Sequence, residues 1–506
     1  MELLERQVEL ETLARQLREA TATAGKLVFV CGEAGIGKSA LVEQFTRKAA
    51  RTGRILWGHC DALETSRVLG PVNEVVAGMS IVPGSATAAP RERLFPEVLA
   101  RLSPPNAACI VVLEDLHWAD ELTLDFVRFI GRRIQHTRCL LIATYRDDEL
   151  PFTHPLRTVL GELTGEHVSR IRLFTLSLGA VTQLTSGSAY DSQRVYNITG
   201  GNPFFVREVL AAPSGAVPET VRDAVLSRLA QCPQEARSLA ELVSLMPGGT
   251  ELWLARAILG DIDGAVDAIT AAGLLTRNDD LLTFRHELGR LAVESTLPLS
   301  SAQALNRSIL ARLRERHTHV SRLVHHASRA HDAQAVLRYA PEAAAEASHA
   351  GAHREASSYW MTALRYADLL GKREQARLWE EHAKECHLIN DVSRGIESAQ
   401  RARELWQILE DIPAQARMLL LLGNQLWKAG DRTLADRHVD NAISLLESLP
   451  PSRDLAMAYS ARARLGMTCG NVDETVAYGQ KAIQLAERLG SHDVQAHALN
   501  NIGAAL

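Results

Sequence analysis

The sequence is poor in aromatic residues and contains no long apolar run. Aromatic side chains make up only 5% of the 506 residues, whereas 46% are hydrophobic, with Ala and Leu dominant. This composition argues against an all-β protein and favours a mostly helical one with closely packed small residues. No run approaches the ~18 apolar residues that a membrane span needs, and no apolar signal segment follows the charged start. We therefore expect no membrane partner.

Paired cysteines and basic blocks are also missing. The seven cysteines are scattered without a C-x-x-C pair, which is typical of reduced core residues in a cytoplasmic protein. The formal net charge is −5, and Lys and Arg are spread along the chain, so nothing here predicts a nucleic-acid surface. The length is enough for about three or four domains.

A complete phosphate-binding loop is the strongest motif. It reads Gly32-Glu33-Ala34-Gly35-Ile36-Gly37-Lys38-Ser39, between an apolar run at 27–31 and a helical pattern that begins at Ala40. This strand, loop and helix order is the context that the G-x-x-x-x-G-K-[ST] motif requires. The glycines let backbone N–H groups up to that of Ala40 face a phosphate chain, and the helix adds its positive N-terminal end. Lys38 is expected to bind the β- and γ-phosphates, and Ser39 to bind Mg²⁺.

A second apolar run, at 109–113, ends in Glu114 and Asp115. Such continuity predicts a strand buried on both faces, as in a parallel sheet. In P-loop ATPases this strand is expected beside the P-loop strand, where it brings an acid to Mg²⁺. We assign Glu114 to the metal and Asp115 to the attacking water, and the reverse division of roles stays open.

A third apolar run, at 139–144, is followed by Arg146. An arginine at a strand tip beside the P-loop can contact the γ-phosphate in a bidentate manner; the alternative is a surface ion pair with Asp147 or Asp148. Asp120 is expected to cap a helix over 121–135. His117 is either near the γ-phosphate or an ordinary loop histidine.

These residues resemble the STAND ATPases, in particular the large ATP-binding regulators of the LuxR type (LAL regulators). The likeness rests on Leu4-Glu5-Arg6-Gln7-Val8-Glu9-Leu10, Gly58-His59-Cys60-Asp61, residues 114–120 and Thr144-Tyr145-Arg146-Asp147. The sequence departs from the family at Glu5, Gln7 and Glu114, where the family has Gly, Glu and Asp. The resemblance implies a parallel sheet of about five strands with the P-loop strand central, an adenine contact from Arg6 and slow ATP hydrolysis.

Two further elements follow the sheet. Residues 199–205, Thr199-Gly200-Gly201-Asn202-Pro203-Phe204-Phe205, predict a rigid turn before a helix. The resemblance makes this turn the lid, with Pro203 packed on adenine; a purely structural turn is the alternative. Apolar runs at 274–277 and 281–286 predict a hairpin, which resembles a winged helix together with helices at 220–230, 235–245 and 252–259. The family places His286 near the β-phosphate of ADP, although a helix-capping role is equally open.

The last 200 residues repeat with a period of 40. Small residues recur at Ala383, Gly423, Ala463 and Gly503 and at Ala402, Ala442 and Ala482, and polar turns recur at Asp391, Asp431 and Asn471. This spacing is typical of stacked helix pairs of the tetratricopeptide type, which bind a peptide, a protein or a small inducer. Five histidines near its start, at 317, 319, 325, 326 and 331, are interpreted as a solvated helix face rather than a metal site.

The sequence thus predicts an α/β P-loop domain of AAA/STAND type (1–165), a helical lid (166–215), a winged-helix domain (216–300) and a tetratricopeptide-like α-superhelix (301–506). The expected cofactors are ATP or ADP and Mg²⁺. We expect a signal-transduction switch of a LuxR-type transcriptional regulator, with an inducer on the repeats and self-association in the ATP state. DNA contact is expected only through a further domain beyond this chain. The alternatives are a sensory ATPase module of a cyclase or kinase, and a nucleotide-stabilised protein-binding scaffold.

Overall fold

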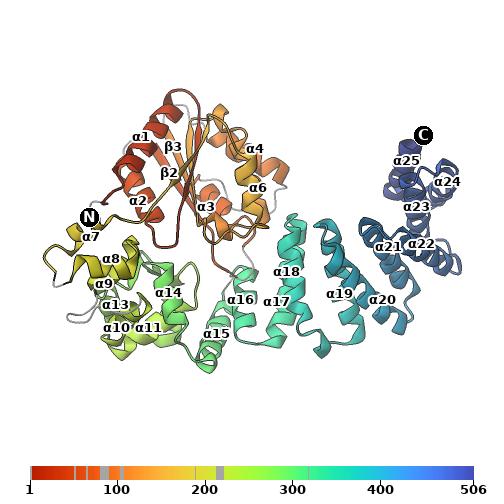
Figure 1. The fold of residues 1–506 in the computed structure, drawn as a ribbon. Helices are drawn as coiled ribbons and strands as arrows, with labels where there is room; N and C mark the ends of the chain where they lie inside the picture. The colour runs from red at the N-terminus through yellow and green to blue at the C-terminus, as the bar shows by residue number, and fades with distance from the viewer. Residues whose placement is uncertain are drawn as a thin grey trace. The chain divides into compact units, whose positions relative to one another are not determined.

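A five-stranded parallel sheet forms the core of the N-terminal part of the chain (Figure 1). The computed structural model describes residues 3–50, 53–63, 67–79, 91–102, 108–188, 190–211, 221–316 and 318–506. They form two compact units, Met1–Asp332 and Ala333–Leu506, which are described separately. The elements of the sheet and its helices are α1 (Gln7–Ala22), β1 (Lys26–Cys31), α2 (Lys38–Ala49), β2 (Gly53–His59), α3 (Gly70–Gly78), α4 (Arg91–Arg101), β3 (Ala108–Glu114), α5 (Glu121–Gly131), β4 (Cys139–Tyr145), α6 (Pro155–Glu162) and β5 (Val168–Arg172).

The strand order is β2-β3-β4-β1-β5. The P-loop strand β1 is therefore an inner strand between β4 and β5, and the expectation that it is central is wrong. The expectation that the acid-bearing strand lies beside it is also wrong, because β3 pairs with β2 and β4. Strands β3 and β4 both consist mainly of apolar residues, so no local pattern distinguishes which of them borders β1. As a result, the tip of β4, with Arg146 just beyond it, lies between the P-loop and the two acids.

Helices cover both faces of this sheet. Leu13 of α1 and Phe45 of α2 join Val28, Val30 and other strand residues in one hydrophobic cluster, while α4 and α6 lie on the opposite face (Figure 1). The strands alternate between the two faces and are buried on each, as the apolar runs predicted. Helix α5 is capped at Asp120, whose side chain accepts a hydrogen bond from the Thr123 amide. It ends at Gly131, four residues before the expected Gln135, and a short 3₁₀ turn (Ile134–His136) follows.

The remainder of the first unit is mostly helical. It contains α7 (Leu178–Thr185), α8 (Ser192–Thr199), α9 (Pro203–Ala211), α10 (Val221–Ala230), α11 (Gln234–Ser244), β6 (Thr250–Glu251), α12 (Leu252–Leu259), α13 (Asp263–Ala271), β7 (Leu275–Asn278), β8 (Leu281–Phe284), α14 (Glu287–Glu294), α15 (Leu299–Arg314) and α16 (Val320–Arg329). The predicted hairpin is present, since β7 pairs antiparallel with β8, and β6 completes a three-stranded sheet. Thr220, the expected start of α10, lies outside the described residues.

Two of the clustered histidines contradict their sequence interpretation. His325 and His326 on α16 are only 5% and 2% exposed, so this part of the helix is packed and not solvated. The His326 ring contacts the Asn306 side chain, with 2.8 Å between Nδ1 and Oδ1. The strong amphipathic character of α16, which buries Leu323 and Val324 on the same side, explains the burial. His317 lies outside the described residues.

The second unit is an array of antiparallel helix pairs (Figure 1). Its helices are α17 (Ala333–His349), α18 (His353–Leu364), α19 (Lys372–Leu388), α20 (Val392–Ile408), α21 (Ile412–Lys428), α22 (Arg432–Glu447), α23 (Arg453–Thr468), α24 (Val472–Leu489) and α25 (His492–Ala505). The three polar turns at Asp391, Asp431 and Asn471 are N-caps, each accepting a hydrogen bond from an amide three residues on. The recurrent alanines at 383, 463, 402, 442 and 482 are fully buried where helices cross.

In the described part of the chain, none of the helices combines the length and apolar character that crossing a bilayer demands. All seven cysteines are free, and all but Cys469 are buried.

Candidate nucleotide-binding site

The phosphate-binding loop joins β1 to α2 through left-handed backbone. Gly35 and Gly37 have φ angles of 76° and 99°, a region that residues with a Cβ seldom adopt. Helix α2 begins at Lys38 and has no side-chain cap, so the first N–H groups of the helix, including that of Ala40, have no intrahelical acceptor. Backbone donors and the positive end of a helix therefore converge on this loop, which is the arrangement that binds phosphate.

Lys38 is folded onto the loop that precedes it. Its Nζ donates hydrogen bonds to the carbonyl oxygens of Gly32 (2.8 Å) and Glu33 (2.9 Å). Burial lowers the pKa of this amine, and the negative charge of Asp115 opposes that effect. The ammonium group is thus held at the mouth of the loop by acceptors that phosphate oxygens could replace.

The two acids occupy the end of β3. Burial and the neighbouring Asp115 raise the pKa of Glu114 to about 7, while His59 and the Ser39 hydroxyl act to lower it. The Oε1 atom of Glu114 is buried and has no hydrogen-bond partner among the described residues. Carboxylate and hydroxyl oxygens are the ligands that Mg²⁺ prefers, so Ser39 and Glu114 fit the expected metal. Asp115 has a left-handed backbone, and burial raises its pKa whereas Arg146 and Lys38 lower it.

Arg146 lies beside these acids and is nearly buried. Its guanidinium group pairs with Glu149 at 2.5 Å and stacks over the ring of Trp118 at 4.6 Å from the ring centroid. The alternative partners from the sequence do not hold it: Asp147 instead pairs with Arg172 at 2.9 Å. Sequence reasoning missed Glu149, which follows three residues after Arg146 and lies at a distance typical of a strong ion pair.

His117 lies within the same charged group. Its ring nitrogens are 3.9 Å from an oxygen of Asp115 and 3.6 Å from one of Glu149. Burial and then the charges of Arg146 and Lys38 lower its pKa to about 2, so the ring is neutral at physiological pH. Neither ring nitrogen has a hydrogen-bond partner among the described residues, which leaves open the two roles that the sequence allowed.

The Gly-Asn-Pro turn packs directly on the phosphate-binding loop. The Asn202 side chain donates a hydrogen bond from Nδ2 to the Ala34 carbonyl (2.9 Å), and the Phe204 amide donates to the Gly35 carbonyl (3.3 Å). A Cβ on Gly35 would lie 2.9 Å from Cβ of Phe204, so this close approach needs glycine. Pro203 begins α9 at the edge of the loop.

His286 reaches this turn from the far end of the first unit. Its ring centroid is 4.3 Å from that of Phe204 in an edge-on arrangement, and it directly precedes α14 without a side-chain cap. Burial, followed by the charges of Arg207 and other arginines, lowers the pKa of His286 to about 3. The structure therefore brings His286 against the residue that contacts the P-loop.

Arg6 connects the N-terminal segment to the same loop. Arg6 is 5% exposed, and its guanidinium group donates hydrogen bonds to the carbonyls of Phe174 (2.6 Å) and Ile36 (3.3 Å). It thus fixes the backbone at one side of the expected nucleotide site. Its adenine contact remains a prediction.

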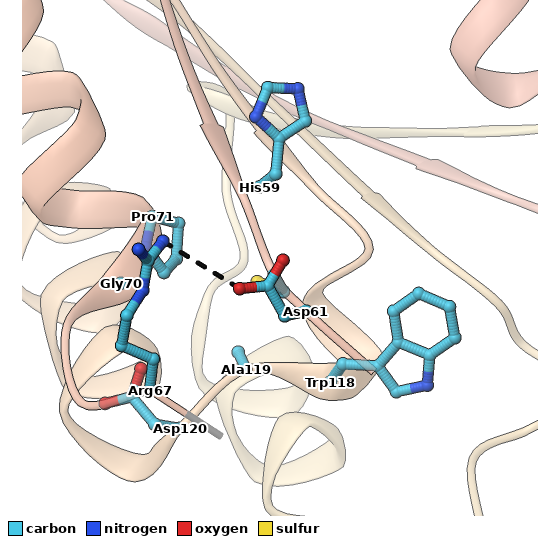
Figure 2. Close-up of a pocket in the computed structure, with 9 residues that line it drawn as sticks. His59, Asp61, Arg67, Gly70, Pro71, Trp118, Ala119 and Asp120 are labelled. Atoms are coloured by element: carbon cyan, nitrogen blue, oxygen red, sulfur yellow. Dashed lines mark ion pairs between the residues drawn. The ribbon is translucent and has the colours of Figure 1, made fainter. Parts of the chain in front are cut away.

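A small pocket beside Glu114 adds residues whose roles the sequence did not suggest. Figure 2 shows Arg67 facing Asp61, with Trp118 on the other side of the carboxylate. His59, at the end of β2, receives its strongest contact from Glu74 (3.1 Å), and its other ring nitrogen is 3.8 Å from Glu114. His59 belongs to a segment that carried the family resemblance, but only the pairing of β2 with β3 places it beside Glu114.

Comparisons with known proteins agree with a nucleotide-binding N-terminal domain. Residues 2–142 match a family model described as AAA ATPase domain, which supports an AAA-type P-loop ATPase domain in that part of the chain. An uncharacterized protein from Rhizobium meliloti (strain 1021) is 24% identical over 452 residues, covering 74% of this chain. The chain spans only 43% of the length of that relative.

Several solved structures show a partial likeness to this chain. A STAND protein with a tetratricopeptide repeat sensor from Pyrococcus horikoshii is 13% identical, with 97% of this chain and 85% of that chain covered and a TM-score of 0.48. The Orc1 protein of Aeropyrum pernix, solved in complex with DNA, is 14% identical, with 62% and 95% covered and a TM-score of 0.32. Scores this low say nothing of the partners of this chain.

Proposed function

We propose that this chain is an ATP-dependent signal-transduction switch of the STAND type. The observation that carries the proposal is the contact between the phosphate-binding loop and the Gly-Asn-Pro turn, made by Asn202 and Phe204 on the carbonyls of Ala34 and Gly35. A loop that binds phosphate through its N–H groups and holds a helical domain through its carbonyls links nucleotide occupancy to the position of that domain. Such a link is what a switch requires.

The residues around the loop have the chemistry for slow ATP hydrolysis. Lys38 and the loop amides would hold the phosphates, and Ser39 and Glu114 would hold Mg²⁺, which supplies charge neutralisation at the phosphates. Burial raises the pKa of Asp115 and so makes its carboxylate a better proton acceptor, while Arg146 and Lys38 oppose that shift; this makes Asp115 suited to orient the attacking water. Arg146 would contact the γ-phosphate after leaving Glu149.

Pro203 and His286 belong to the part of the site that would distinguish ADP from ATP. Pro203 begins the helix beside the P-loop, and His286 lies against Phe204. We assign Pro203 and Arg6 to the adenine side and His286 to the β-phosphate side. A nucleotide can shift the lid only if it binds the two positions of the lid with different affinity.

The helical array would receive the signal. Stacked helix pairs present an extended surface to a small-molecule or protein inducer, and we propose that inducer and ATP together permit self-association. If the protein is a LuxR-type transcriptional regulator, as we propose, it acts in the cytoplasm. Its contact with DNA would then be made by a further domain outside this chain. A sensory module of a cyclase or kinase, and a nucleotide-stabilised scaffold, are the rival readings.

The decisive test compares Lys38→Ala with Lys48→Ala, an exposed lysine on the same helix. Removing the Lys38 ammonium should weaken ATP binding at least about tenfold, because each hydrogen bond to a charged group contributes about 1.5–3 kcal/mol. Titration calorimetry measures the affinity, and light scattering measures ATP-dependent assembly. If Lys38→Ala binds ATP and assembles as the unmodified chain does, the switch is refuted.

Phosphate release under steady-state conditions separates the readings. Turnover that depends on Lys38 supports the ATPase switch. ADP that stays bound without exchange or turnover, with assembly unaffected, supports the scaffold instead.

A further inference from the structure

Basic and aromatic side chains gather on one part of the helical array. The patch, here called the basic patch, comprises His387 on α19, Trp427 and Lys428 on α21, and Arg464 on α23. The helices α19, α21 and α23 are the first members of successive pairs, and each contacts the next. In stacked repeats such helices form a continuous binding surface.

Specific contacts hold these side chains together. Lys428 donates a hydrogen bond from Nζ to the His387 carbonyl at 3.2 Å, and the Arg464 guanidinium lies 5.8 Å from the centroid of the Trp427 ring. Trp427 is 37% exposed, so part of its ring is open to solvent beside the arginine. The patch therefore offers a partly exposed tryptophan next to two cationic groups.

Two nitrogen atoms of the patch have no hydrogen-bond partner within the described residues. Nη2 of Arg464 and Nδ1 of His387 are buried, and neither has a hydrogen-bond partner among the described residues. Leaving a buried donor unpaired costs about 1–3 kcal/mol. An acceptor from a bound ligand would satisfy the Arg464 donor.

The positive charge of the patch is also uncompensated. Burial and then Arg464 lower the pKa of Lys428, and burial, Lys428 and Arg464 lower the pKa of His387. Within residues 318–506, no ion pair with a carboxylate is found for Lys428 or Arg464. Arg462, only two residues from Arg464, instead pairs with Asp436, Asp440 and Glu474, so the nearby acids neutralise Arg462 and not Arg464.

We propose that the basic patch binds a small organic anion that carries a flat ring. The anionic group, a phosphoryl or carboxylate, would accept hydrogen bonds from Lys428 and Arg464, and the ring would lie against the exposed part of Trp427. Charge-assisted hydrogen bonds to such groups are strong and directional, and an indole is a good surface for a flat ring. This inference rests on the proposed function, because it names the ligand class that the array would sense.

The test measures binding of three probes to the full chain by titration calorimetry: phenyl phosphate, benzoate and inorganic phosphate. Saturating ADP and Mg²⁺ are present throughout, so that the P-loop does not compete for phosphate. Binding of phenyl phosphate but not benzoate indicates a phosphoryl ligand, and the reverse indicates a carboxylate. Both outcomes support the site, whereas no saturable binding of any probe overturns it.

Matched variants locate the binding. Arg464→Gln and Lys428→Gln should each weaken the better probe at least about tenfold, as loss of one charge-assisted bond implies. Arg488→Gln, which removes an exposed arginine from α24, should leave it unchanged. Trp427→Leu should weaken phenyl phosphate more than inorganic phosphate, because only the former has a ring. Circular dichroism checks that each variant keeps its helices.

Equal binding by Arg464→Gln, Lys428→Gln and the unmodified chain overturns the proposal. ATP affinity and turnover are measured on the same preparations. If none of the probes binds while ATP binding still depends on Lys38, only the basic patch is refuted. If ATP does not bind while the patch variants weaken probe binding as expected, only the switch is refuted.

Discussion

Replacing Asn202 with alanine tests whether the lid is coupled to the phosphate-binding loop. The side chain is 4% exposed; it donates to the Ala34 carbonyl at 2.9 Å and accepts from the Phe204 amide at 3.1 Å. Asn202→Ala removes both hydrogen bonds and leaves the Ala34 carbonyl without its side-chain donor. We expect the turn to separate from the loop and nucleotide affinity to fall.

The magnitude follows from these two bonds. A net hydrogen bond contributes about 0.5–1.5 kcal/mol, and an unsatisfied buried partner costs about 1–3 kcal/mol, which together suggest roughly 2–3 kcal/mol. If docking of the lid is fully coupled to binding, ADP affinity falls about 30- to 150-fold, since about 1.4 kcal/mol corresponds to a factor of ten. Titration calorimetry gives the affinity, and hydrogen exchange over residues 32–40 reports on the loop.

Two further variants make the test specific. Asn202→Asp keeps the acceptor for Phe204 but replaces the donor by a carboxylate oxygen facing the Ala34 carbonyl, so it should weaken binding at least as much as alanine does. Asn197→Ala removes an exposed amide that only accepts from Gln193 (2.9 Å), and should change little. The coupling is refuted if Asn202→Ala binds ADP with unchanged affinity and the exchange of the loop stays the same.

Two predictions concern stability. Burial and three neighbouring arginines lower the pKa of His325 to about 3. Below pH 6.5 the His325 side chain is therefore protonated in the unfolded state but stays neutral in the folded state. The folded state loses stability as the pH falls from 6.5 towards 3. At pH 5 the loss of stability amounts to about 2 kcal/mol. Urea unfolding at pH 7 and pH 5 should show that His325→Gln loses less stability than the unmodified chain. An equal loss in both proteins would contradict the lowered pKa of His325. In the array, a Cβ on Gly423 would lie 2.8 Å from Cγ2 of Val439, whereas one on Gly503 meets nothing within 4 Å. Both changes to alanine gain up to about 1 kcal/mol of helix propensity. Only Gly423→Ala should lower the melting temperature, because overpacking costs about 1–3 kcal/mol. Equal shifts of the melting temperature in the two variants would contradict the close contact between Gly423 and Val439.

Local signals in the sequence were sufficient for most elements. The phosphate-binding loop was predicted with its strand and helix, because glycine, lysine and serine at fixed spacing have few other uses. The N-caps at Asp391, Asp431 and Asn471 were marked by polar turns at a constant period, and all three are present. The hairpin of β7 and β8 followed from two short apolar runs around an Asn-Asp turn.

Contacts between distant segments could not be read in this way. The position of β4 between β1 and β3 depends on how three similar apolar strands pair, and nothing in their residues encodes the order. The placement of His59 next to Glu114 depends on that order. His325 and His326 were misread because two adjacent histidines look like a polar surface, whereas the neighbouring apolar residues turn this side of α16 inward.

In the proposed switch, a weakly bound lid would serve regulation better than a rigid one. The carbonyls of Ala34 and Gly35 accept hydrogen bonds from Asn202 and Phe204, and the N–H groups of the same segment would face the phosphates. Any change in that backbone on nucleotide binding would therefore alter the contacts of Asn202 and Phe204. Coupling is reciprocal: if nucleotide strengthens these contacts, holding the lid in place must strengthen nucleotide binding by the same factor. An event on the helical domains that draws Phe204 away would therefore release nucleotide without touching it. His286 is packed against Phe204, and in this proposal it is the residue through which helix α14 would move Phe204.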